Sequence, residues 1–165
     1  MKHEFALSLL LVVSAAATAP AQTKFSNSGK CGKPDVQQAA PAPDDPTHVV
    51  TIAQGKCMPV KPVEIAGSLV KEAAFAEHGE ATGNNAHVWG TYAETLANGE
   101  KVFYHYESTA VTQNGALQTM QNKWRIVGGS AKLAGIKGQG TCKGKGTPDG
   151  GLAFDCEGEY TLAGK

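Results

Sequence analysis

The sequence predicts an all-β protein, a small and mostly antiparallel β-barrel of about eight strands, and three observations predict it. Twenty glycines are spread through the 165 residues. Asn98-Gly99 and Asn114-Gly115 each stand between alternating runs, which is the strongest short-range signature of a β-hairpin. No long segment after residue 21 has a helical period. We therefore expect a meander and a C-terminal hairpin, with a disulfide-tied N-terminal extension.

Residues 1–21 are predicted to be a signal peptide. Lys2 precedes a short apolar run, and Ala19-Pro20-Ala21 offers the small residues that signal peptidase reads. We expect cleavage before Gln22 and a periplasmic or secreted protein; the alternative is an uncleaved anchor. Equal numbers of basic and acidic residues, 15 each, provide no field that would attract nucleic acid. No later segment is long and apolar enough for membrane insertion.

Residues 22–46 are predicted to form an extended lead-in, and residues 47–165 the β-barrel domain. The prolines between residues 41 and 46 disfavour a helix or a central strand. Gly-Lys-Cys occurs at residues 29–31 and again at 55–57, which suggests a Cys31–Cys57 disulfide that ties the lead-in to the barrel. Four cysteines in an exported chain favour two disulfides over zinc, since none forms a CxxC pair.

Residues 69–80 fit a strand or a helix, and we favour a strand because glycine turns bracket them. The meander is predicted at residues 86–97, 100–113 and 116–127. A glycine-bounded corner with one helical turn follows at residues 128–135.

The final hairpin is predicted from Thr147-Pro148-Asp149-Gly150, which suits a type I turn. A three-residue loop from Pro148 to Gly150 places Cys142 directly opposite Cys156, within reach of a disulfide.

Two-residue turns in the meander would place one set of side chains inside the barrel. We expect the interior set to be the one that contains Trp124, because Lys123 and Arg125, which alternate with it, belong on the face in solvent. The binding candidates on the predicted inner face are Tyr92, Glu94, His105, Glu107, Asn122 and Trp124.

An imidazole beside buried carboxylates could bind a ligand or move protons near neutral pH. The structural alternative is a wet barrel mouth, or a simple Glu107–Asn122 hydrogen bond. His105 and Glu107 have no evident third metal ligand, so we expect no metal and no cofactor. Trp89, Tyr104 and Tyr106 on the predicted outer face suggest a homo-oligomer, a dimer or trimer.

WRIVGGSAKLAGIKG at residues 124–138, followed by Gly158-Glu159-Tyr160, resembles a family of small exported bacterial proteins. These proteins are similar to the calycin-like barrels of allene oxide cyclases and dirigent proteins. The resemblance covers roughly residues 86–163 and implies the barrel fold. Plant members cyclise an epoxide or steer radical coupling, often as trimers, but the resemblance carries no catalytic residue over to this chain.

We expect an exported binding or interaction module without catalytic activity. Its ligand would be a small, partly apolar molecule in the barrel mouth, or a partner protein on the outer face. One alternative is a cofactor-independent isomerase or cyclase that uses Glu94, His105 and Glu107. The other is a structural envelope protein.

Overall fold

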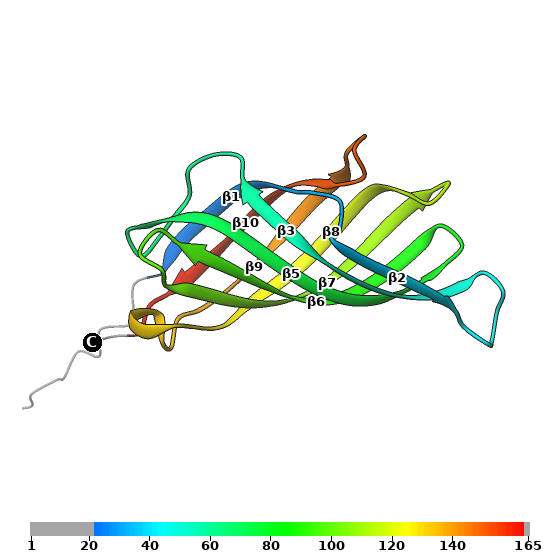
Figure 1. The fold of residues 1–165 in the computed structure, drawn as a ribbon. Helices are drawn as coiled ribbons and strands as arrows, with labels where there is room; N and C mark the ends of the chain where they lie inside the picture. Colours follow the sequence, from blue (N-terminus) through cyan, green and yellow to red (C-terminus); the bar gives the residue numbers. More distant parts are fainter. Residues whose placement is uncertain (1–21, 164–165) are drawn as a thin grey trace, which may run out of the picture.

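The computed structural model describes residues 22–163 and confirms an all-β antiparallel barrel (Figure 1). The predicted signal peptide lies outside the described residues. Among residues 22–163, no helix is long and apolar enough to cross a membrane. The strands are β1 Thr23–Cys31, β2 Val36–Pro41, β3 His48–Pro59, β4 Glu64–Ile65, β5 Ser68–Thr82, β6 Asn85–Leu96, β7 Lys101–Gln113, β8 Ala116–Gly129, β9 Lys137–Gly146 and β10 Leu152–Thr161, with a 3-10 turn η1 at Ala131–Leu133.

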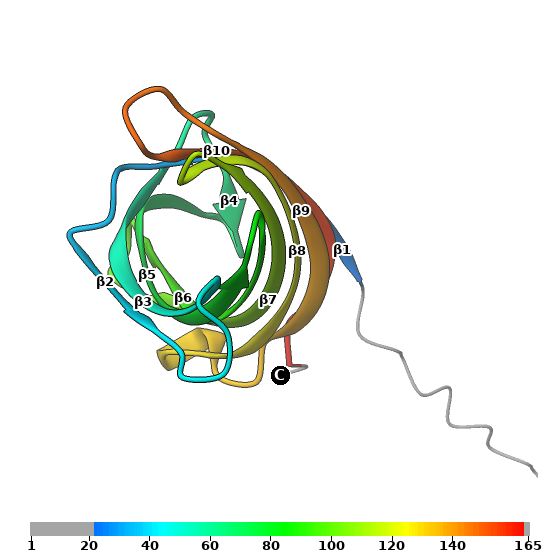
Figure 2. The ribbon, with the colours of Figure 1, turned by 90° about the vertical axis from the view of Figure 1, so that its right-hand side faces the viewer.

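The strands close into a ring in the order β1, β10, β9, β8, β7, β6, β5 and β3, because β3 pairs with β1 as well as with β5. The view along the barrel in Figure 2 shows this ring. β2 lies outside the ring and pairs along β3, while β4 forms a two-residue pairing with the start of β5. Each neighbouring pair is antiparallel, so backbone hydrogen bonds run around the whole wall.

The β1–β3 pairing is the shortest contact in the ring and forms its seam. It joins Gly29 to Pro59, Lys30 to Met58 and Cys31 to Cys57. A disulfide links the last pair, as the sequence predicted. β1 pairs with β10 along its whole length but with β3 only over these three residues. The disulfide therefore cross-links the shortest strand pairing of the ring.

The C-terminal hairpin has the predicted register. Cys142 lies opposite Cys156 and is joined to it by a disulfide. Thr147 N donates to the Gly151 carbonyl at 2.9 Å, and Gly150 has a φ of 81°, which a glycine adopts without strain.

The N-terminal segment differs from the expected lead-in, because it supplies β1 and β2 to the sheet. Alternation explains this: Phe25, Asn27 and Cys31 face inward while Lys24 and Lys30 face solvent, which is the pattern of a barrel strand. The barrel therefore begins at Thr23. Residues 69–80 lie within β5, so the preference for a strand over a helix is confirmed.

The prediction that His105 and Glu107 are on the inner face of β7 is wrong. The β6–β7 loop has three residues, Ala97 to Gly99, since Thr95 pairs with Lys101. This extra residue turns Tyr104 and Tyr106 inward and His105 outward. A bulge between Val111 and Thr112 in this pairing adds a second one-residue shift, so β8 returns to its predicted face.

One end of the barrel is filled by apolar side chains, and η1 contributes one of them. The side chains of this plug are at most 7% exposed: Val63, Ile65, Val70, Leu96, Val102, Leu133 and Ile136. Towards the opposite end, a smaller cluster packs Cys31, Cys57 and Ala73 against Phe75 and Phe154, and several inward-facing side chains are only partly buried. We call this region the open half of the interior, and it is lined by Phe75, Glu77, Val88, Tyr106, Asn122 and Phe154.

Candidate functional site

A buried acid, Glu94, lies inside the barrel beside the plug. Its side chain projects inward from β6 and is 2% exposed. Tyr104 on β7 donates its hydroxyl to Glu94 Oε2, and Asn27 on β1 donates its amide to Oε1 at 3.4 Å. Burial raises the pKa of Glu94 from 4.5 to about 7, although the Tyr104 hydrogen bond lowers it. The interior therefore holds a carboxyl that can change charge near neutral pH.

A second acid, Glu77, projects from β5 into the open half. Tyr106 on β7 donates its hydroxyl to Glu77 Oε2 at 2.5 Å. The two strands are not neighbours, since β6 runs between them and places Gly90 opposite both residues. A Cβ at Gly90 would lie 2.7 Å from Tyr106 Cε1, so only glycine lets the phenol ring cross β6. Burial raises the pKa of Glu77, and the hydrogen bond from Tyr106 lowers it.

The same pairing of an inward aromatic ring with a glycine recurs around the wall. Trp124 on β8 lies opposite Gly140 on β9, and a Cβ there would come within 2.6 Å of Trp124 Cε2. The other such pairs are Phe154 with Gly29 and Phe75 with Gly55. The rings therefore lie along the wall over neighbouring strands and supply apolar surface to the interior.

Some inward polar atoms have unused hydrogen-bonding capacity. Within residues 22–163, the buried Asn27 Oδ1, Asn122 Oδ1 and Trp124 Nε1 have no hydrogen-bond partner. Asn27 is 8% exposed and its amide nitrogen is engaged with Glu94. Asn122 donates its amide to Ser108 Oγ at 3.0 Å, which likewise leaves its oxygen free. Buried acceptors without donors are costly, so these atoms indicate sites that a ligand or water can fill.

Four of the predicted site residues face inward as expected: Tyr92, Glu94, Asn122 and Trp124. The inward placement of His105 and Glu107 is wrong, because the longer β6–β7 loop turns both outward. His105 Nδ1 lies 3.5 Å from Arg125, and Glu107 accepts from His87 Nε2 at 2.7 Å.

The predicted outer aromatic stripe loses two of its members for the same reason. Tyr104 and Tyr106 form the carboxyl contacts inside the barrel, while Trp89 stays on the outer wall. The ring of His87 is tilted against Trp89 at a centroid distance of 4.0 Å, and His78 stacks on Trp89 at 5.8 Å. The homo-oligomer stays a prediction, and Tyr104 and Tyr106 are no longer candidates for its subunit interface.

Glu77 and Asn27 were not identified from the sequence. Neither lies in the 86–127 meander from which the site was predicted. The inward alternation of Val102, Tyr104, Tyr106 and Ser108 was the signal that could have placed the tyrosines correctly.

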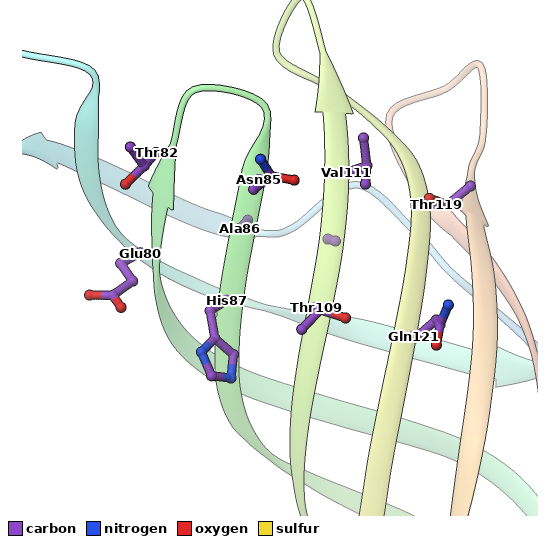
Figure 3. A pocket seen from close by; sticks show the side chains of 10 residues that line it. Glu80, Thr82, Asn85, Ala86, His87, Thr109, Val111, Thr119 and Gln121 are labelled. Atoms are coloured by element: carbon purple, nitrogen blue, oxygen red, sulfur yellow. The ribbon is translucent and has the colours of Figure 1, made fainter.

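The outer wall has a hollow of about 470 Å³ across β5 to β8 (Figure 3). Most of its side chains point away from the barrel interior and are exposed. They include Glu80, Asn85, His87, Thr109, Thr119 and Gln121. Water can satisfy exposed polar groups, so these residues do not by themselves indicate a ligand, unlike the buried polar atoms of the interior.

The comparisons with known proteins complete this description. No family model matches the chain. No curated protein sequence matches it either. Among solved structures, the chain is similar to the pterocarpan synthase dirigent protein GePTS1. The identity is 12% and the TM-score 0.46, with 95% of this chain and 100% of that chain covered.

Proposed function

We propose that the chain is a non-catalytic binding protein that takes a small, partly apolar molecule into the open half of its barrel. The observation that carries this proposal is the set of inward polar atoms with unused capacity, Asn27 Oδ1 and Asn122 Oδ1, among aromatic rings. Binding sites for small molecules combine apolar walls with a few placed polar groups, and the interior has this composition.

The two disulfides fit an extracellular or otherwise oxidising compartment. We infer a periplasmic or secreted protein whose signal peptide is cleaved before Gln22. N-terminal sequencing of the exported protein tests this inference, and a chain that still begins at Met1 would refute it.

The binding proposal can be tested with N-phenylnaphthylamine, a neutral dye whose fluorescence rises in apolar surroundings. Ser108 and Thr109 are adjacent on β7 and face opposite sides, with Ser108 6% exposed inside and Thr109 exposed outside. Ser108→Phe should fill the interior and abolish the fluorescence rise, whereas Thr109→Phe should preserve it.

Asn122→Leu provides a second interior variant if Ser108→Phe does not fold. Circular dichroism and the thermal midpoint establish folding for each variant. Equal dye binding by wild type, both interior variants and the outer control would show that the interior is not the site. Failure of wild type to bind the dye or any member of a metabolite set in a thermal-shift screen would favour a structural envelope protein.

A second function, acid–base catalysis as in a cofactor-independent isomerase, is favoured by one feature. Glu94 has a pKa near 7 because of its burial, which suits proton transfer at neutral pH. His105 and Glu107 lie on the outer wall and cannot assist it. Turnover of a bound metabolite that is lost in Glu94→Gln, with binding retained, would establish this function over simple binding.

A further inference from the structure

The barrel interior is acidic and contains no base to balance it. Glu77 and Glu94 face inward, from β5 and β6. Lysine, arginine and histidine side chains of the ring strands alternate onto the outer wall, so none faces inward within the described part of the chain. Taking a carboxylate out of water is costly unless a cation or several hydrogen-bond donors compensate it.

The interior also contains buried hydrogen-bond acceptors that have no donor. The Tyr104 and Tyr106 hydroxyls, which could serve a ligand, are already donated to the two carboxyls. Within residues 22–163, Asn27 Oδ1 and Asn122 Oδ1 are buried acceptors without a partner, and Trp124 Nε1 is a buried donor without one. A ligand that donates hydrogen bonds can satisfy such amide oxygens, which a ligand with acceptors alone cannot do.

Aromatic rings supply the third feature. Tyr104 contacts both Tyr92 and Trp124 edge-to-face, at centroid distances of 5.8 and 5.7 Å. Phe25 packs edge-to-face on Trp124 at 5.9 Å. At Glu77 the rings are those of Tyr106, its hydrogen-bond donor, and Phe75, the neighbouring inward residue on β5. Aromatic faces attract organic cations, and the attraction is larger where water is excluded.

We propose that the ligand of this interior is an organic cation, with one ammonium group on an apolar body. An ammonium group provides positive charge and three donors, which are what the carboxyls and the free amide oxygens lack. We place it at Glu77, because that acid lies in the open half, whereas Glu94 is enclosed beside the plug. This inference rests on the proposed function, since it names the ligand class of the same site.

The test compares three ligands of similar size that differ in charge: phenethylamine, phenethyl alcohol and phenylacetate. Isothermal titration measures each against wild type, Glu77→Gln, Glu94→Gln and the outer-wall control Glu107→Gln. Wild type should bind the amine about tenfold more tightly than the alcohol, since a charge-assisted hydrogen bond is worth roughly twice a neutral one. Phenylacetate should bind weakest.

Glu77→Gln should lose the preference for the amine while still binding the alcohol. Glu94→Gln should reduce the preference less, and Glu107→Gln should leave it unchanged. Equal affinity for amine and alcohol in wild type, or a preference that survives Glu77→Gln, would overturn the inference. Binding of the alcohol and of N-phenylnaphthylamine distinguishes failure of this inference from failure of the proposed function. A barrel that binds small neutral molecules without a preference for cations would still bind both.

Discussion

Replacing Glu94 with glutamine should stabilise the protein at alkaline pH and leave it nearly unchanged at acid pH. Glutamine keeps the size of the side chain and can still accept the hydroxyl of Tyr104. It cannot ionise, so it removes the cost of a charge at a position that is 2% exposed.

The size and sign of this effect follow from the pKa of Glu94. Burial raises that pKa from 4.5 to about 7, partly offset by the Tyr104 hydrogen bond. Between these two pH values the folded protein keeps the proton and the unfolded chain has lost it. The free energy of unfolding therefore falls as the pH rises, by about 1.36 kcal/mol for each pH unit. Between pH 4.5 and about 7, ionisation of Glu94 should lower the free energy of unfolding by about 3 kcal/mol in total. Above about pH 7 this decrease should stop.

Urea unfolding with both disulfides intact measures the effect, at about pH 5 and about pH 8. Glu77 also has a raised pKa and contributes in the same direction, so the comparison is wild type against Glu94→Gln at each pH. The variant should become the more stable protein by about 3 kcal/mol at the higher pH. Glu107→Gln on the outer wall should show no such crossover.

A constant difference between wild type and Glu94→Gln at the two pH values would refute the reasoning. It would mean that Glu94 titrates alike in the folded and unfolded states and is therefore reached by water in the folded protein.

Three further changes have defined outcomes. Tyr104→Phe withdraws the donor from the buried carboxyl and should cost about 1–3 kcal/mol in urea unfolding, with the larger loss above neutral pH. Gly140→Val inserts a side chain where the Trp124 ring lies and should cost about 1–3 kcal/mol; an unchanged midpoint would mean that the ring is free to move. The paired change Cys31→Ser with Cys57→Ser should cost about 3 kcal/mol and speed hydrogen exchange first at residues 29–31 and 57–59. Uniformly faster exchange around the ring would contradict the special role of the seam.

The C-terminal hairpin was predictable because its determinants are local. Pro148, Asp149 and Gly150 set the loop length, and the loop length sets which residues face each other up to Cys142 and Cys156. Gly140 on β9 accommodates Trp124 of the other neighbouring strand, β8, which turn chemistry could not indicate.

The meander shows where such local reasoning stops. Its strands were predicted close to their observed bounds, yet the face of β7 was reversed. One additional loop residue, Ala97, was enough to exchange Tyr104 and His105 between the interior and the outer wall. The bulge between Val111 and Thr112 then restored the face of β8, so Trp124 was placed correctly although the register leading to it was not. Neither shift has a residue signature as distinct as Asn-Gly.

Glu77 illustrates a second limit. Its partner Tyr106 is 29 residues away, and the contact depends on Gly90 lying between them on β6. The contact can be predicted only when the registers of both strand pairs, β5 with β6 and β6 with β7, are known. The sequence placed Glu77 in a segment that fitted a strand or a helix, so its inward direction had no local indicator.

The ionisation of the interior carboxyls and the proposed ligand class depend on the same quantity, the free-energy cost of a buried carboxylate anion. A carboxyl whose pKa is raised by burial is one that the folded protein stabilises poorly as an anion. Any group that binds beside it with a positive charge removes part of that cost, so the ligand and the proton compete for the same oxygen atoms. Glu94 accepts hydrogen bonds from Tyr104 and Asn27, so it has less to gain from such a ligand than Glu77, whose one donor within residues 22–163 is Tyr106. The acid in the open half is therefore both the more accessible and the less satisfied of the two, and this combination is the reason to place the cation there.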